Sequence, residues 1–140
     1  MKNEFLLHIV ASIAYRFEKV MKHSDSGFGN FKIGTECRTP CAILNHMHHV
    51  IKATRVFIQT EEVLVNPDSM VKLDGEIIRF KMELTLVKEL LSKQEIPVEY
   101  SKKLLQGPFV DLLTHIGQLA MLQGLYGNAI PAEDFSKPVI

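Results

Sequence analysis

Asp111 and His115 lie four residues apart in the apolar run "FVDLLTHIGQLAMLQGLYG", which spans residues 109–127. Between Lys103 and Glu133, Asp111 is the only formally charged side chain. Residues four apart share one face of a helix, so the carboxylate and the imidazole would stack one turn apart. Carboxylate oxygens and neutral imidazoles are common ligands of divalent metal ions. The spacing therefore predicts a pair of metal ligands on this segment.

A third ligand can come from "LNHMHHV", residues 44–50, which carries three of the six histidines in the chain. At about 100° per residue, His46 lies about 60° from the centre of the apolar stripe of that predicted helix. On the same basis His49 lies about 120° away on the same side, and His48 about 140° away on the other. His46 is thus expected to reach the interior, His49 to lie at the rim, and His48 to face solvent.

His46, Asp111 and His115 together make a candidate metal site. Two ligands on one helix and a third on a facing helix are a recognised way of building such a site in a helical bundle. Three protein ligands leave coordination positions open for water or substrate, which is typical of catalytic rather than structural sites. The alternative is that Asp111, Thr114, His115 and Gln118 form a polar outer face on that helix.

Cys37 and Cys41 form a C-x3-C pair just before His46 and His49. A zinc site made by all four is an alternative, although zinc sites favour other cysteine spacings. Cys41 falls on the first turn of the predicted helix and is expected to be buried as a small hydrophobic residue. A cysteine nucleophile with a histidine base is a further alternative, and the spacing favours no particular pair.

Four long helical segments would position these residues. Apolar side chains recur at steps of three and four through residues 2–23, 39–60, 73–95 and 108–125. Thr39 and Pro40 predict the start of the second segment, because Thr is a good N-cap and Pro suits the first turn. Residues 98–106 are expected to add a short helical turn, and residues 132–140 an extended C-terminal tail. The predicted fold is an all-α, up-down four-helix bundle.

The composition indicates one intracellular domain spanning residues 1–140. Hydrophobic residues make up 46% of the chain, which is ordinary for a soluble globular domain. Sixteen basic and sixteen acidic residues cancel, which argues against nucleic-acid binding, because phosphate contacts require a positive surface. No run of about 18 apolar residues occurs, so no membrane-spanning helix or membrane partner is expected. Two cysteines without a signal-like N-terminus favour the reducing cytoplasm.

Two segments resemble the DinB-like superfamily of metal-binding four-helix bundles (the DNA-damage-inducible, YfiT type). "RTPCAILNHMHHVI", residues 38–51, resembles the start of the family's second helix, where Thr-Pro opens the helix and a histidine follows. "GPFVDLLTHIGQLAMLQGLYGNAIP", residues 107–131, resembles its last helix, with a His-x-Gly-Gln core and a Gly-x-x-Ile-Pro ending. Helix order and length agree over nearly the whole chain.

The resemblance implies a metal site made by one histidine of the second helix and two residues four apart on the last helix. Those positions correspond to His46, Asp111 and His115. Many family members have histidine where this chain has Asp111, so the resemblance leaves the metal open: zinc or nickel first, then manganese or iron. It also implies a homodimer.

The resemblance also implies a reaction class. Some members are thiol S-transferases that use bacillithiol, mycothiol or glutathione, and a mycothiol-dependent maleylpyruvate isomerase is related. The implied function is a divalent-metal-dependent enzyme in which a low-molecular-weight thiol attacks a small-molecule electrophile, since a bound cation lowers the pKa of a thiol. The alternatives are a metal-assisted hydrolase and a non-catalytic ligand-binding or interaction bundle. No residue identifies the thiol or the electrophile.

Overall fold

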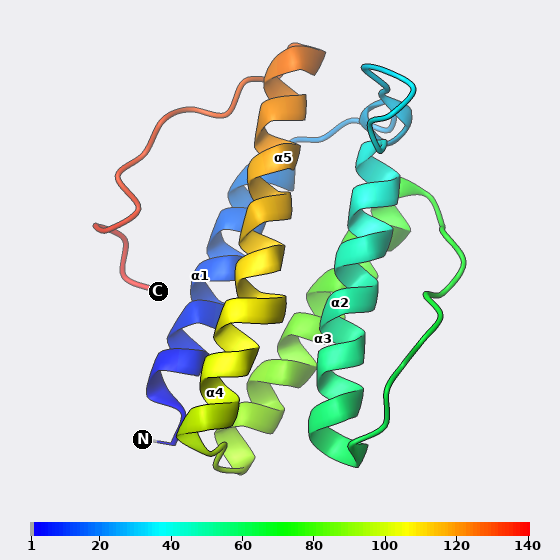
Figure 1. The fold of residues 1–140 in the computed structure, drawn as a ribbon. Coiled ribbons are helices and arrows are strands. Elements are labelled where there is room, and N and C mark those ends of the chain that lie inside the picture. The colour runs from blue at the N-terminus through cyan, green and yellow to red at the C-terminus, as the bar shows by residue number, and fades with distance from the viewer. Residues whose placement is uncertain (1) are drawn as a thin grey trace.

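The structure is a computed structural model that describes residues 2–140, and Figure 1 shows helices joined by irregular connections. Its elements are α1 (Glu4–Met21), η1 (Phe28–Asn30), α2 (Pro40–Thr60), α3 (Leu73–Lys93), α4 (Val98–Leu104), η2 (Leu105–Phe109) and α5 (Val110–Tyr126). η1 is a 3₁₀ turn and η2 a π-helical turn. No strand occurs in the described part of the chain. The all-α prediction is confirmed.

The four long helices do not alternate in direction. α1 and α5 run one way, and α2 and α3 run the other way (Figure 1). Asp68, in the connection 61–72, accepts hydrogen bonds from the side chains of Asn45 and Lys52 in the first two thirds of α2. The connection therefore carries the chain back along α2 before α3 begins, and residues 61–72 can span roughly 40 Å when extended. The predicted up-down order is not confirmed, because α2 and α3 are parallel.

The hydrophobic core lies between the four long helices. α2 packs against α3 on one flank and against α5 on the other, and α1 likewise contacts both α3 and α5. Phe17 of α1 and Phe80 of α3 are fully buried, with ring centroids 4.5 Å apart. Phe109 and Leu112, around the start of α5, are also fully buried. This packing fixes the two flanks of α2, and α2 carries three of the histidines.

The start of α2 is the one predicted from sequence. Thr39 adopts an extended backbone conformation, and its hydroxyl accepts a hydrogen bond from the Ala42 amide at 3.2 Å. Pro40 occupies the first turn, where a missing backbone N–H leaves no hydrogen bond unmade. This cap sets the register of α2 and so places His46 in its second turn.

The last helical segment is longer than predicted. A break was expected at Gly107 and Pro108, but α4, η2 and α5 form one continuous helical run from Val98 to Tyr126. Pro108 lies inside η2. A wider π turn accommodates a proline that would otherwise clash with the carbonyl four residues earlier. Asp111 follows directly on this turn, in the first turn of α5.

The C-terminal residues after α5 form an extended tail, as predicted, and Figure 1 shows it crossing beside α1. Glu133 holds the tail against α1: its carboxylate accepts a hydrogen bond from the Tyr15 hydroxyl at 2.5 Å and one from Lys19 Nζ at 2.7 Å. The Arg16 guanidinium lies 4.1 Å from the ring centroid of Phe135. The tail covers α1 on the side away from α2.

Candidate metal centre

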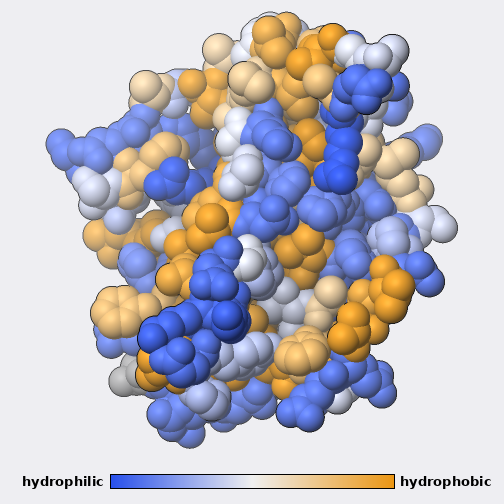
Figure 2. All heavy atoms as spheres, viewed as in Figure 1, coloured by the Kyte–Doolittle hydropathy of each residue, from blue (hydrophilic) through white to orange (hydrophobic). Residues whose placement is uncertain are grey.

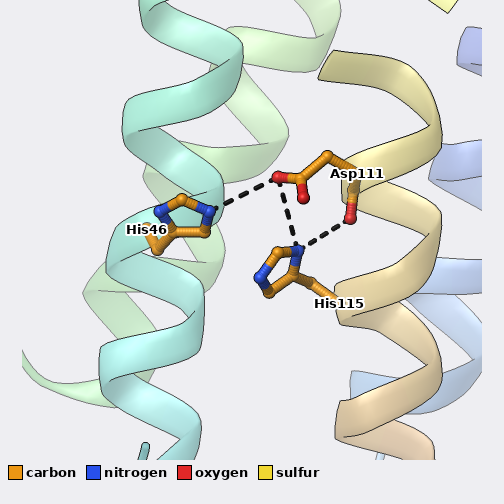
Figure 3. Close-up of side chains that lie close together, drawn as sticks. All are labelled: His46, Asp111 and His115. Atoms are coloured by element: carbon orange, nitrogen blue, oxygen red, sulfur yellow. Dashed lines mark hydrogen bonds and ion pairs between the residues drawn. The ribbon is translucent and has the colours of Figure 1, made fainter. Parts of the chain in front are cut away.

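His46, Asp111 and His115 converge between α2 and α5 (Figure 3). We call these three residues the metal trio. His46 Nε2 lies 3.3 Å from Asp111 Oδ2, and His115 Nδ1 lies 3.5 Å from the same oxygen. One ligand atom from each residue can be chosen so that all three lie within 4.8 Å of one another. It is the only group of three or more such residues found in the part of the chain that the structure describes.

The two helices position the trio by simple geometry. Asp111 and His115 are one turn apart on α5, and the antiparallel α2 brings His46 opposite them, where the two imidazole centroids are 4.7 Å apart. Figure 3 shows the three side chains pointing into the space between the helices. The outer-face alternative for this side of α5 is therefore wrong for His115, which is 8% exposed.

A backbone hydrogen bond fixes the tautomer of His115. Its Nδ1 lies 2.7 Å from the main-chain carbonyl oxygen of Asp111. Because a carbonyl only accepts, Nδ1 must carry a proton and donate it. In the neutral ring the lone pair is then on Nε2, and an imidazole whose other nitrogen is held in this way is typical of metal-ligating histidines.

Burial keeps His46 in the neutral form that a metal requires. Desolvation lowers the pKa of His46 below its ordinary value, and the neighbouring His115 and Arg38 lower it further. The hydrogen bond and the charge of Asp111 act in the opposite direction. The net effect is a lower pKa, so His46 is neutral at pH 7.

The donor set fits a divalent cation. Asp111 makes no ion pair with a lysine or arginine in residues 2–140; its only close cationic candidates are the two histidines. Ligands about 2.1 Å from a tetrahedral zinc ion are about 3.4 Å apart, close to the spacing of His46 and Asp111. The widest pair must draw closer by up to roughly 1.4 Å, which side-chain rotations can supply. Zinc, nickel, manganese and iron all accept two imidazoles and a carboxylate.

The trio is open to its surroundings on two sides. The side chains of His46 and Asp111 are 33% and 41% exposed. Asp111 borders a cavity of about 810 Å³ that runs along α2 and α4, and His115 borders one of about 340 Å³ beside the 31–38 loop. An ion held here would keep coordination positions accessible to small molecules.

The other two histidines of α2 do not belong to the trio. His48 was expected to face solvent, and that prediction is wrong: it is 4% exposed and lies near the charged groups of Arg79, Glu83 and Glu76 on α3. Its Nδ1 is buried without a hydrogen-bond partner, 3.9 Å from Asp68 Oδ2. His49 lies at the rim of the larger cavity, as predicted.

The two cysteines are not brought together with the histidines of α2 as a metal-ligand group in the described residues. Cys37 is exposed in the loop before α2, whereas Cys41 is buried. Burial, and to a smaller extent Glu76, raise the pKa of the Cys41 thiol, so it is not an activated nucleophile. The prediction of Cys41 as a small buried hydrophobic residue is confirmed.

A second polar cluster lies on the opposite flank of α2, facing α3. We call it the α3-side cluster: Arg55, Glu83, Glu76, Arg79 and His48. Arg55 donates two hydrogen bonds to Glu83, at 2.6 and 3.0 Å, and Arg79 donates two to Glu76, at 2.5 and 3.1 Å. The side chain of Glu76 is fully buried. Apart from His48, no residue of this cluster was singled out from the sequence, because charged side chains spaced along a helix are normally solvated.

Sequence reasoning also missed the larger cavity. Its walls include Phe57, Tyr100 and Lys103, which no motif singles out. The only sequence signal was the stripe of small and apolar residues that continues along α2 beyond His46, and such a stripe is usually core.

Comparison with known proteins gives no relative from which a role could be transferred. No protein-family model, no curated protein and no solved structure matches the chain. None of the described helices is both long and apolar enough to cross a membrane. The functional argument therefore depends on the metal trio and the cavities beside it.

Proposed function

We propose that this protein is a divalent-metal-dependent enzyme in which His46, Asp111 and His115 hold one ion. The observation that carries the proposal is the convergence of two imidazoles and a carboxylate with no lysine or arginine on Asp111 among the described residues. A carboxylate that serves only stability is normally paired with a cation, as Glu76 and Glu83 are here. Asp111 instead faces two imidazoles, which is the arrangement that a cation completes.

The reaction we propose is thiol transfer, as expected from the resemblance to the DinB-like superfamily. A bound divalent ion would supply positive charge that lowers the pKa of a thiol and so favours thiolate at neutral pH. His115 is held for this task by its hydrogen bond to the Asp111 carbonyl, and His46 is kept neutral by burial. The cavities on either side offer room for a thiol and an electrophile.

Metal content tests the first part of the proposal. Wild-type protein, purified without a histidine tag or added metal, is expected to hold about one divalent ion per chain by plasma mass spectrometry. His115→Ala is expected to lose the ion, whereas His23→Ala, which removes an exposed histidine outside the trio, should retain it. A wild type that is metal-free and cannot be loaded with zinc, nickel or manganese would refute the proposal.

Turnover assays test the reaction class. Metal-loaded wild type is expected to conjugate 1-chloro-2,4-dinitrobenzene with bacillithiol, mycothiol or glutathione, and His46→Ala to lose this activity. Thiol-independent cleavage of p-nitrophenyl esters would instead favour metal-assisted hydrolysis. Retained metal without either activity would favour a ligand-binding bundle. The homodimer implied by the resemblance is tested separately by light scattering.

A further inference from the structure

The larger cavity is an elongated groove that begins at the trio and follows α2 toward its C-terminal end. One wall is a single stripe of α2 that passes through His49, Ala53 and Phe57, and Asp111 is the trio residue that borders the cavity. We call this cavity the apolar groove; its volume of about 810 Å³ lies within the range of small-molecule sites. Figure 2, which views this face, shows apolar side chains beside polar ones between the helices.

The opposite wall is a stripe of the α4–α5 run that passes through Tyr100, Lys103, Gly107 and Asp111. Gly107 leaves this wall hollow, because a Cβ atom built there would meet no atom within 4 Å. Ala53 faces the groove from α2 with only a methyl side chain. The hollow thus arises from two small residues on facing helices.

The groove is lined by apolar surface that the described chain leaves uncovered. Phe57 is 38% exposed, Val110 45% and Val63 75%. Phe57 and Tyr100 form an aromatic pair across it, with centroids 6.0 Å apart. Exposed apolar side chains gathered in a concave site, rather than scattered singly, mark a binding surface.

Lys103 gives the groove a positive charge away from the trio. It makes no ion pair in residues 2–140, whereas its neighbour Lys102 pairs with Glu99 at 2.7 Å. Burial raises the pKa of Tyr100, and the charge of Glu61 raises it further, so one acid also lies near this end of the groove. Eight residues of helix separate Lys103 from Asp111, which corresponds to about 12 Å at the α-helical rise.

We infer that the apolar groove binds an elongated apolar organic acid. Its carboxylate lies at Lys103, its hydrocarbon or aromatic body lies along the hollow between Ala53 and Gly107, and its other end reaches Asp111 of the metal trio. The placement of the other end at the trio rests on the proposed function, in which the trio is the reacting site. Binding in the groove does not depend on it, since the walls are present without metal.

Calorimetric titration of decanoate tests the inference, using both chelator-treated and zinc-supplemented protein. Wild type is expected to bind decanoate in both forms. Ala53→Phe fills the groove and is expected to weaken binding by more than roughly tenfold. Lys103→Gln is expected to weaken decanoate by roughly two- to fivefold, the range of an exposed ion pair, and to leave 1-decanol unchanged. The matched control Lys102→Gln should bind both ligands as wild type does.

Gly107→Leu is a second blocking variant in case Ala53→Phe fails to fold, and circular dichroism checks each variant. The inference is overturned if chelator-treated wild type does not bind decanoate, if both folded blocking variants bind it normally, or if Lys103→Gln weakens decanol as much as decanoate. Binding by a wild type that holds no metal would support the groove while the proposed metal function fails. Conversely, a wild type that holds metal but does not bind decanoate would support the metal site and overturn the groove.

Discussion

The two polar clusters on the flanks of α2 are built from similar residues and arranged in opposite ways. On the α3 flank, Glu76 and Glu83 each accept two hydrogen bonds from an arginine. On the α5 flank, Asp111 has no such cation in the described residues and faces two imidazoles, with 41% of its side chain exposed.

The difference separates a stabilising cluster from a binding one. A bidentate arginine saturates a carboxylate and leaves it little capacity for a further ligand. Asp111 keeps lone pairs available, next to nitrogen donors that are neutral or held in one tautomer. The α3 flank should therefore govern stability and the α5 flank should govern metal binding.

The largest expected effect is on the α3 flank. Arg79→Met leaves the fully buried Glu76 carboxylate without its cation, and is expected to lower the free energy of unfolding by about 3 kcal/mol. Chemical denaturation measures it, with Lys88→Met on the exposed side of the same helix as the control. A loss no larger than that of the control would show that the two flanks do not differ in this way.

Metal addition should act on the other flank alone. A divalent ion at 100 times its dissociation constant stabilises a folded protein by about 2.7 kcal/mol. Wild type and Arg79→Met are both expected to gain this increment in denaturant melts, and His115→Ala to gain none. If metal still stabilised His115→Ala by the same amount, the ion would bind elsewhere.

Asp111→Asn is expected to have a smaller effect still when metal is absent. The carboxylate is partly exposed and is paired only with histidines, so the free energy of unfolding should change by less than about 0.5 kcal/mol. The same variant should lose the stabilisation by metal. A large loss of stability in chelator would mean that Asp111 is a structural residue like Glu76.

The smallest effect concerns the connection 61–72 and its dependence on pH. The hydrogen bond from Lys52 is the main cause that lowers the pKa of Asp68 below its usual 3.8. Because the folded-state pKa is lowered, the stabilisation is present above about pH 4 and is lost as pH falls through the folded-state value. Hydrogen exchange of residues 61–72 should be slower at pH 5 than expected for an unstructured segment, and this protection should fade as the pH falls below the usual Asp pKa of 3.8. Asp68→Asn should reduce the protection already at pH 5. If exchange of residues 61–72 were unchanged in this variant, the Lys52–Asp68 hydrogen bond would not be what holds the connection.

Local signals predicted the local features of this fold. Thr39 and Pro40 mark the start of α2, because capping depends only on neighbouring residues. The spacing of Asp111 and His115 and the angular position of His46 identified the three residues that the structure brings together. Whether they hold a metal stays a prediction.

Non-local features were not predictable in the same way. The apolar stripe of α2 describes one buried flank, but α2 has two, and His48 lies on the second. The second flank carries charged residues, and these are buried only because they pair with charged residues of α3. The direction of α3 depends on the path of residues 61–72, which carry no periodic pattern. The π turn at Pro108 depends on an otherwise continuous helix tolerating a proline.

The parallel run of α2 and α3 has a consequence for the order in which the molecule assembles. Pairs across the α2–α3 flank are separated by as few as 28 residues, as for Arg55 and Glu83, whereas His46 and Asp111 are 65 apart. α1 meets α3 at separations from 63 residues (Phe17 and Phe80) to 88 (Asn3 and Leu91), and it meets α5 near 100, as in the hydrogen bond of Gln123 to Val20 (103). Closing longer loops costs more chain entropy, so the α2–α3 flank is expected to consolidate first. A metal ion would then be captured by a nearly complete fold, and could not act as the nucleus around which the chain folds.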